Sequence, residues 1–126
     1  MKKKPPRGSQ RSRPSTRAIG TRAERRAVRH YRVRGYRVLA TNAWVGGYEL
    51  DLVLRRGRTI VFCEVKAKSG PGLGDPLEMV TEEKRRRIVR AAEAWLAARP
   101  ELADCRIRFD VVAERGRHIE LVPNAF

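Results

Sequence analysis

The chain has 126 residues, 41% of them hydrophobic, which is enough for one domain of ordinary size with one core. Its formal net charge is +15, and none of its apolar runs approaches the roughly 20 residues that span a bilayer. These values exclude a membrane-spanning protein. The charged N-terminus also lacks the apolar segment of a secretory signal, so we expect a cytoplasmic protein.

Positive charge extends over the whole chain. Residues 1–17 carry seven Lys or Arg and no acid, which leaves 22 basic and 14 acidic residues, a net charge of +8, for residues 18–126. Such an excess favours polyanions, because neutralised phosphates release condensed counterions. Nucleic acid is therefore the expected partner, and a solvated basic surface is the alternative. No basic amphipathic helix with a bulky apolar face stands out, so no membrane partner is expected.

Residues 1–17 hold three of the seven prolines and almost nothing apolar. A segment of this composition buries too little surface to offset its ordering entropy, so we expect a disordered basic arm. The arm either contacts phosphates without specificity or is dispensable. Residues 18–126 are expected to form one folded domain.

A first helix is predicted from Arg22 to Arg34, with Thr21 and Glu24 at the spacing of a capping box and Gly35 as its end. Ala23, Ala27 and Tyr31 share one of its faces. Three strand-like runs separated by short turns follow, and we expect antiparallel hairpins. They are Tyr36–Ala43, Tyr48–Leu54 and Thr59–Ala67. The third run is apolar on both faces until its end, as in a central strand.

A Gly-rich loop at 69–74 leads to a second helix that begins at Asp75 or only at Thr81 and ends near Arg99. Its apolar stripe consists of Ile88, Ala91, Ala92, Trp95 and Leu96. Two more strands are predicted at Arg106–Ala113 and His118–Val122. The order α-β-β-β-α-β-β predicts an α/β fold with a mixed central sheet flanked by helices.

The cysteines predict no metal site of the zinc type. Cys63 lies in an apolar strand-like run and Cys105 just before another, so both are expected to be buried thiols. They form no CxxC, and His30 and His118 lie far apart in the sequence.

Two carboxylates and a lysine at the end of an apolar strand suggest a different metal site. Side chains alternate along a strand, so Glu64 and Lys66 share one face, and antiparallel pairing brings Asp51 of the preceding strand close to Glu64. Buried charges are usually paired or coordinate a metal. Hard oxygen ligands of this kind suit Mg²⁺ or Mn²⁺.

In the catalytic interpretation, Asp51 and Glu64, helped by the carbonyl of Val65, hold a metal that activates water at a scissile phosphate. Lys66 orients that water and stabilises the developing charge, and Glu24 supplies a further ligand directly or through water. In the structural alternative, Glu64 and Lys66 form an ordinary ion pair. Glu24 is then only the capping-box acid, and Asp51 is a solvated strand residue.

Motif residues spread over 20–126 carry a resemblance. They are Gly20, Glu24, Ala27, Gly35-Tyr36, Asn42, the runs Glu49–Val53 and Phe62–Lys66, Gly74, Pro76, Glu78, Val80, Lys84, the run Arg108–Val112 and the terminal Pro123–Phe126. In these residues the chain resembles the small bacterial YraN-like family. That family is assigned to the restriction-endonuclease-like PD-(D/E)XK superfamily and is related in fold to archaeal Holliday-junction resolvases.

The resemblance implies a Mg²⁺-dependent endonuclease that acts on DNA, including branched DNA. Its catalytic residues would be Glu24, Asp51, Glu64 and Lys66, and dimerisation would suit an enzyme that cuts junctions. Two positions depart from the pattern. Leu50 stands where the superfamily has the proline of its name, and Tyr48 separates Gly47 from Glu49. Neither change removes a ligand.

Basic residues near the site are candidate phosphate contacts. Lys68 follows Lys66 on the same strand face, and Lys84, Arg85, Arg86 and Arg87 begin the second helix. They point in different directions around that helix, so some must simply be solvated.

Trp44 and Tyr48 suggest base stacking, although packing is the favoured interpretation. Two other functions remain open. One is a non-catalytic nucleic-acid-binding protein that keeps the fold, and the other is an assembly protein bound to ribosomal RNA through residues 1–17.

Overall fold

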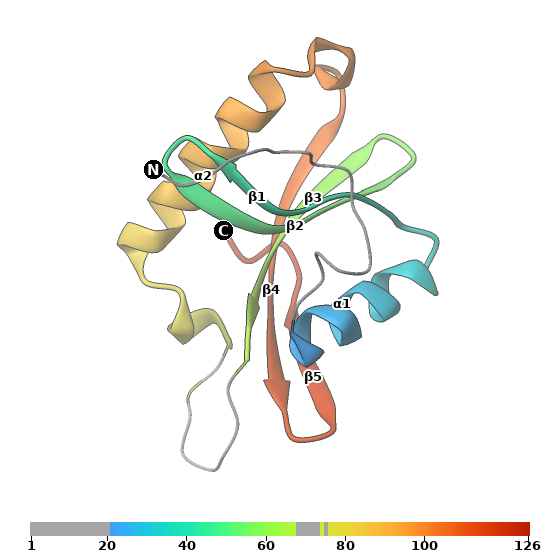
Figure 1. Ribbon diagram of the computed structural model, residues 1–126, viewed down its shortest axis with the longest axis vertical. Helices are drawn as coiled ribbons and strands as arrows, with labels where there is room; N and C mark the ends of the chain where they lie inside the picture. The colour runs from blue at the N-terminus through green and yellow to red at the C-terminus, as the bar shows by residue number, and fades with distance from the viewer. Residues whose placement is uncertain (1–20, 68–73, 75) are drawn as a thin grey trace.

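The computed structural model describes residues 21–67, 74 and 76–126 (Figure 1). The elements are α1 (Arg22–Arg32), β1 (Arg37–Val45), β2 (Tyr48–Arg56), β3 (Thr59–Lys66), the 3₁₀ turn η2 (Pro76–Met79), α2 (Glu82–Ala97), the 3₁₀ turn η3 (Pro100–Leu102), β4 (Arg106–Arg115) and β5 (His118–Val122). The predicted order of helices and strands is confirmed. The predicted arm at 1–17, Lys68, Asp75 and all of the Gly-rich loop but Gly74 lie outside the described residues.

The described strands form one sheet in the order β1-β2-β3-β4-β5. Pairing is antiparallel except between β3 and β4, which are parallel because α2 crosses over between them. The helices pack on opposite faces of this mixed sheet, as predicted (Figure 1). No helix in the described part of the chain is long and apolar enough to cross a membrane.

The hairpin between β1 and β2 has the short turn that the sequence predicts, but β1 is longer than predicted. Val45 pairs with Tyr48, so the connection is only Gly46-Gly47, and both glycines have positive φ, +61° and +78°. Two-residue turns of this kind match the strand twist and favour glycine. Because the turn is so short, β1 continues two residues past its predicted end at Ala43.

Helix α1 packs its small residues and Tyr31 on the sheet. Ala23, Ala27 and Tyr31 are at most 1% exposed, as their spacing predicts. The helix ends at Arg32, two residues earlier than predicted. Gly35 adopts φ +90°, and the Tyr36 N–H returns to the Tyr31 carbonyl at 3.0 Å, which closes the helix end.

Helix α2 begins at the later of its two predicted starts. Thr81 is the N-cap, with its hydroxyl accepting a hydrogen bond from the Lys84 N–H at 3.2 Å, and Pro76–Met79 form a separate 3₁₀ turn. The predicted stripe faces the core, where Trp95 packs edge-on against Phe62 of β3. Strand β3 is therefore covered on both faces.

Candidate active site

The two strands that carry the predicted acids separate at one end. The β2–β3 pairing ends with Leu52 opposite Cys63. Beyond that pair the Asp51 side chain replaces a backbone partner, because its Oδ2 accepts a hydrogen bond from the Val65 N–H at 2.8 Å. The half-buried Asp51 is thereby fixed beside the end of β3.

Glu64 lies at the same end of β3 and is 6% exposed. Its Oε2 accepts a hydrogen bond from the Tyr48 hydroxyl at 3.2 Å and lies 3.2 Å from the Lys66 ammonium. The structure therefore brings Glu64 and Lys66 together, as strand alternation predicts. The Tyr48 contact was not predicted, because it depends on how the β1–β2 hairpin leans over β3.

Glu24 caps α1 and also faces β1. Its N–H donates to the Thr21 hydroxyl at 3.0 Å, and its Oε1 accepts from the Thr21 N–H at 3.2 Å, which completes the predicted capping box. Its Oε2 accepts from the Asn42 amide at 3.3 Å. Asn42 lies between the β1 residues that pair with Leu50 and Leu52, across from Asp51. Glu24 can therefore cap the helix and still lie near the acidic residues of β2 and β3.

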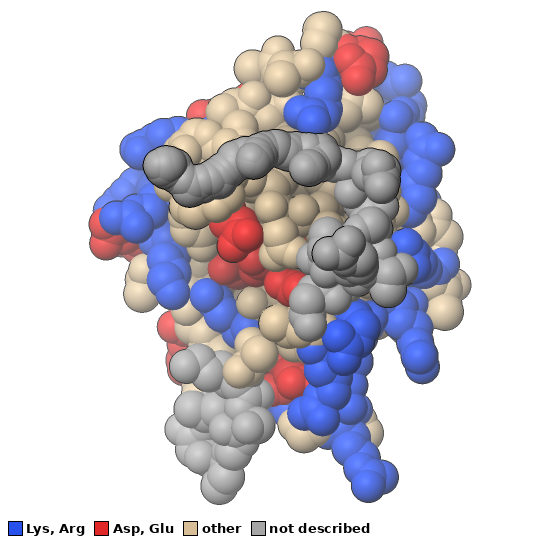
Figure 2. Space-filling model, viewed as in Figure 1, with Lys and Arg blue, Asp and Glu red and all other residues tan. Residues whose placement is uncertain are grey.

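Two of the carboxyl groups at this end of the sheet, Asp51 and Glu49, have raised pKa values. Burial raises the pKa of Asp51 to about 8, with the Glu64 and Glu24 charges adding to the effect and the Val65 N–H and Lys66 opposing it. Burial also raises the pKa of Glu49, helped by Glu24 and Glu64. The cluster carries more negative charge than Lys66 offsets. Figure 2 shows acidic atoms in the middle of this face, with basic atoms to either side.

The donor set of the cluster fits a hard divalent cation. Mg²⁺ is commonly bound through one or two carboxylates, with waters and phosphate oxygens as the remaining ligands. Asp51 and Glu64 provide that number. In the described residues, no group of three or more His, Cys, Asp or Glu side chains is placed to hold a metal. The fit is therefore to an open, partly hydrated ion and not to an enclosed site of the zinc type.

Comparison with known proteins identifies the family. The family model for "Uncharacterised protein family UPF0102" matches residues 23–113, which include Glu24, Asp51, Glu64 and Lys66. The chain belongs to the UPF0102 (YraN) family. It is 43% identical to a UPF0102 protein of Serratia proteamaculans over 114 residues, which cover 89% of this chain and 97% of that protein. A UPF0102 protein of Dechloromonas aromatica is 41% identical over 112 residues, 89% and 91% of the two chains.

Two of the predicted basic contacts of this UPF0102 chain are engaged within the protein. The Arg85 guanidinium donates to the carbonyls of Val80 at 3.1 Å and Leu77 at 3.4 Å, which ties the start of α2 to η2. Arg87 pairs with Glu83 at 2.9 Å in an exposed i,i+4 pair, which is easily exchanged. Lys84 also lies in the first turn of α2.

The two aromatic residues of the β1–β2 hairpin differ in exposure. Trp44 is 73% exposed, so the prediction that it packs in the protein is wrong. Tyr48 is half-buried and packs against the α2 side of the core, as predicted. The difference arises because Trp44 pairs with the exposed Glu49 near the tip of a hairpin, where a side chain has few neighbours.

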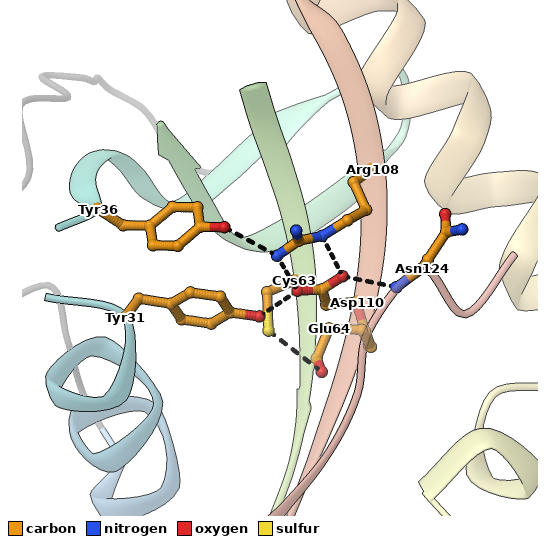
Figure 3. A network of polar contacts seen from close by, with 7 residues as sticks. All are labelled: Tyr31, Tyr36, Cys63, Glu64, Arg108, Asp110 and Asn124. Carbon is orange, nitrogen blue, oxygen red and sulfur yellow. Dashed lines mark hydrogen bonds and ion pairs between the residues drawn. The ribbon is translucent and has the colours of Figure 1, made fainter. Parts of the chain in front are cut away.

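Another buried carboxylate, Asp110 on β4, was not predicted to have a role (Figure 3). It is 0% exposed and accepts from the Tyr31 hydroxyl at 2.6 Å and the Asn124 N–H at 2.9 Å. The Arg108 guanidinium donates to both of its oxygens, at 2.9 and 3.0 Å. Asp110 thereby joins α1, β4 and the C-terminal segment. The sequence signal was the Arg108-x-Asp110 spacing, which puts both residues on one strand face.

Asp110 also lies directly beside the strand that carries Glu64. Cys63 is its register partner on β3, and the Cys63 thiol contacts the Glu64 carbonyl at 3.9 Å (Figure 3). Cys63 is buried and Cys105 is half-buried, and both are free thiols. The prediction of two buried thiols is therefore right for Cys63 and wrong for Cys105. We assign the Asp110 network a positioning role, because it fixes the elements on which the acidic cluster is built.

Proposed function

We propose that this protein is a divalent-metal-dependent endonuclease of the PD-(D/E)XK type that hydrolyses phosphodiester bonds in DNA, including branched DNA. The observation that carries the proposal is the meeting of Asp51, Glu64 and Lys66 where β2 and β3 separate. A carboxyl group whose pKa is raised by burial and by a neighbouring carboxylate, as that of Asp51 is, is poorly suited to a purely structural site. It is well suited to holding a cation.

Each residue has a defined task in this proposal. Asp51 and Glu64 would hold Mg²⁺ or Mn²⁺, which when bound supplies positive charge at the phosphate and lowers the pKa of a water. Lys66, held beside Glu64, orients the attacking water and stabilises the charge that develops on the phosphate oxygens. The Tyr48 hydroxyl holds the Glu64 carboxylate in place. Glu24 supplies a further carboxylate near the same site.

The experiment is a cleavage assay on a labelled panel of duplex, single strand, flap, four-way junction and structured RNA. Each substrate is incubated with Mg²⁺, with Mn²⁺ or with a chelator. We expect cutting that requires the metal and is lost in Asp51→Asn, Glu64→Gln and Lys66→Ala, with a fall of roughly a hundredfold or more for each. Folding and binding of the three variants should remain largely intact.

The matched control is Asp104→Asn, the same acid-to-amide change at a side chain that is 91% exposed. It should cut like the wild type. Retained full activity in any one of the three site variants would remove that residue from the mechanism. Tight binding without cutting by the wild type would move the assignment to a non-catalytic nucleic-acid-binding protein of the same fold.

Trp44 is a candidate stacking platform for an unpaired base next to the site. Stacking on an exposed aromatic is sequence-tolerant and contributes about 1–3 kcal/mol per base. Because the other tryptophan, Trp95, is buried, quenching of the exposed indole by a single strand reports on Trp44. Trp44→Ala should weaken binding to single-stranded and branched substrates more than to duplex. An equal effect on all three would exclude the stacking role.

A further inference from the structure

A basic groove lies between α1 and the turn that joins β4 to β5. Its volume is about 720 Å³, and six arginines line it: Arg22, Arg25, Arg26, Arg29, Arg34 and Arg117. The Arg26 guanidinium donates to the Gly116 carbonyl at 2.7 Å, which holds the helix against the turn. Figure 2 shows basic atoms over α1, on the right of the central acidic atoms and on the same face.

The arginines follow the helix axis. Arg22, Arg26 and Arg29 are separated by four and three residues, so they form one stripe along α1. Seven residues of helix rise roughly 10 Å. That length matches about three nucleotide steps of about 3.4 Å along one strand. A stripe of guanidinium groups with this reach suits consecutive phosphates of a nucleic-acid backbone.

Not all of these charges are used inside the protein. Arg22 and Arg26 both pair with Glu114, at 2.8 and 3.0 Å, and so hold the groove together. Arg29 and Arg117, from opposite walls, form no ion pair within the described part of the chain. Two exposed guanidinium groups that line one groove and have no acidic partner there among the described residues are free to make charge-assisted hydrogen bonds to the phosphates of a bound anion.

We propose that the groove between α1 and the β4–β5 turn binds the phosphate backbone of a nucleic acid, holding the DNA beside the acidic cluster. The inference rests on the proposed function for its substrate class, although backbone binding needs neither the metal nor cleavage. An anionic membrane is a poorer match. Membrane-surface helices present bulky apolar residues, whereas the exposed large hydrophobic side chain on this helix face is only Val33 among the described residues.

The test measures binding of the full chain to a labelled DNA duplex in a chelator, over a range of salt concentrations. Arg29→Gln/Arg117→Gln removes the two uncommitted charges. We expect its affinity for the duplex to be lower than that of the wild type by roughly tenfold or more at about 0.1 M salt. The slope of log affinity against log salt concentration should be less steep by the amount that corresponds to about two phosphate contacts. The matched control is Arg32→Gln/Arg90→Gln, which makes the same charge change at two exposed arginines outside the groove and should shift the slope far less.

An equal salt dependence of DNA binding in the two double variants would overturn the groove proposal. A wild type that binds no nucleic acid would overturn it too. A groove variant that loses binding to phosphatidylserine vesicles but keeps its DNA affinity would also overturn it. Cleavage in Mg²⁺ is measured on the same preparations. If the groove variant has a reduced salt dependence of DNA binding but the wild type cuts no DNA, the groove proposal stands and the nuclease proposal fails. If the wild type cuts DNA with metal but both double variants bind it with the salt dependence of the wild type, the groove proposal fails and the nuclease proposal stands.

Discussion

Two carboxylates on the same sheet, the half-buried Asp51 and the fully buried Asp110, are in opposite electrostatic situations. Asp110 accepts hydrogen bonds from Tyr31, Arg108 and the Asn124 backbone, so its negative charge is fully compensated. Within the described residues Asp51 accepts one hydrogen bond, from the Val65 N–H, and faces the like charges of Glu64 and Glu24. A compensated buried charge organises a fold. A carboxylate that faces other carboxylates is stabilised when a cation binds beside it, and it therefore indicates a cation-binding site.

The largest effect on stability is expected from Asp110→Asn. The change leaves the Arg108 guanidinium without its buried partner, and breaking such a pair costs about 3 kcal/mol or more. Denaturant unfolding, followed by the fluorescence of the buried Trp95, measures the loss. Glu120→Gln, which breaks the exposed pair with Arg115, is the control and should cost about 1 kcal/mol or less. Equal costs would show that Asp110 does not organise the fold.

A smaller loss is expected from Tyr31→Phe. The change removes one hydrogen bond of 2.6 Å to the buried carboxylate and keeps the ring packed against Tyr36. Hydrogen bonds to charged groups contribute about 1.5–3 kcal/mol. Metal-dependent cleavage by the folded variant should remain, because the residue only positions α1. A cleavage defect in fully folded Tyr31→Phe would mean that the network acts on the chemistry itself.

The smallest effect, of opposite sign, is expected from Asp51→Asn in the absence of metal. The amide oxygen can still accept the Val65 N–H, while the charge repelled by Glu64 disappears. We expect the free energy of unfolding to rise by roughly 1 kcal/mol, as often happens when a functional residue is replaced. The same denaturant titration measures it. A loss similar to that of Asp110→Asn would mean that Asp51 is a structural residue.

Most of the fold followed from local patterns in the sequence. The capping box of Thr21 and Glu24, the apolar stripe of α2 and the two-faced hydrophobicity of β3 each depend on residues close together in the chain. Boundaries were less predictable. The ends of α1 and β1 depend on Gly35 and on the Gly46-Gly47 turn, where one residue more or less changes which backbone groups are paired.

The only part of the site that was predicted is the part that follows from the alternation of side chains along a strand. That rule places Glu64 beside Lys66 and brings Asp51 near them. The contacts of Tyr48 with Glu64 and of Tyr31 with Asp110 join residues 16 and 79 positions apart, so no local pattern reveals them. The exposure of Trp44 and the groove of α1 likewise depend on tertiary packing, although the spacing of Arg22, Arg26 and Arg29 was visible in the sequence.

The most direct test of the contrast between Asp51 and Asp110 is the melting temperature of the wild type and of Asp51→Asn, each with and without Mg²⁺ or Mn²⁺. A ligand that binds only the folded state raises its stability. The wild type should therefore melt at a higher temperature with the metal, while Asp51→Asn, at least as stable as the wild type without metal, should not respond. An equal rise in both proteins would contradict the assignment of Asp51 as a metal ligand and, with it, the proposed active site.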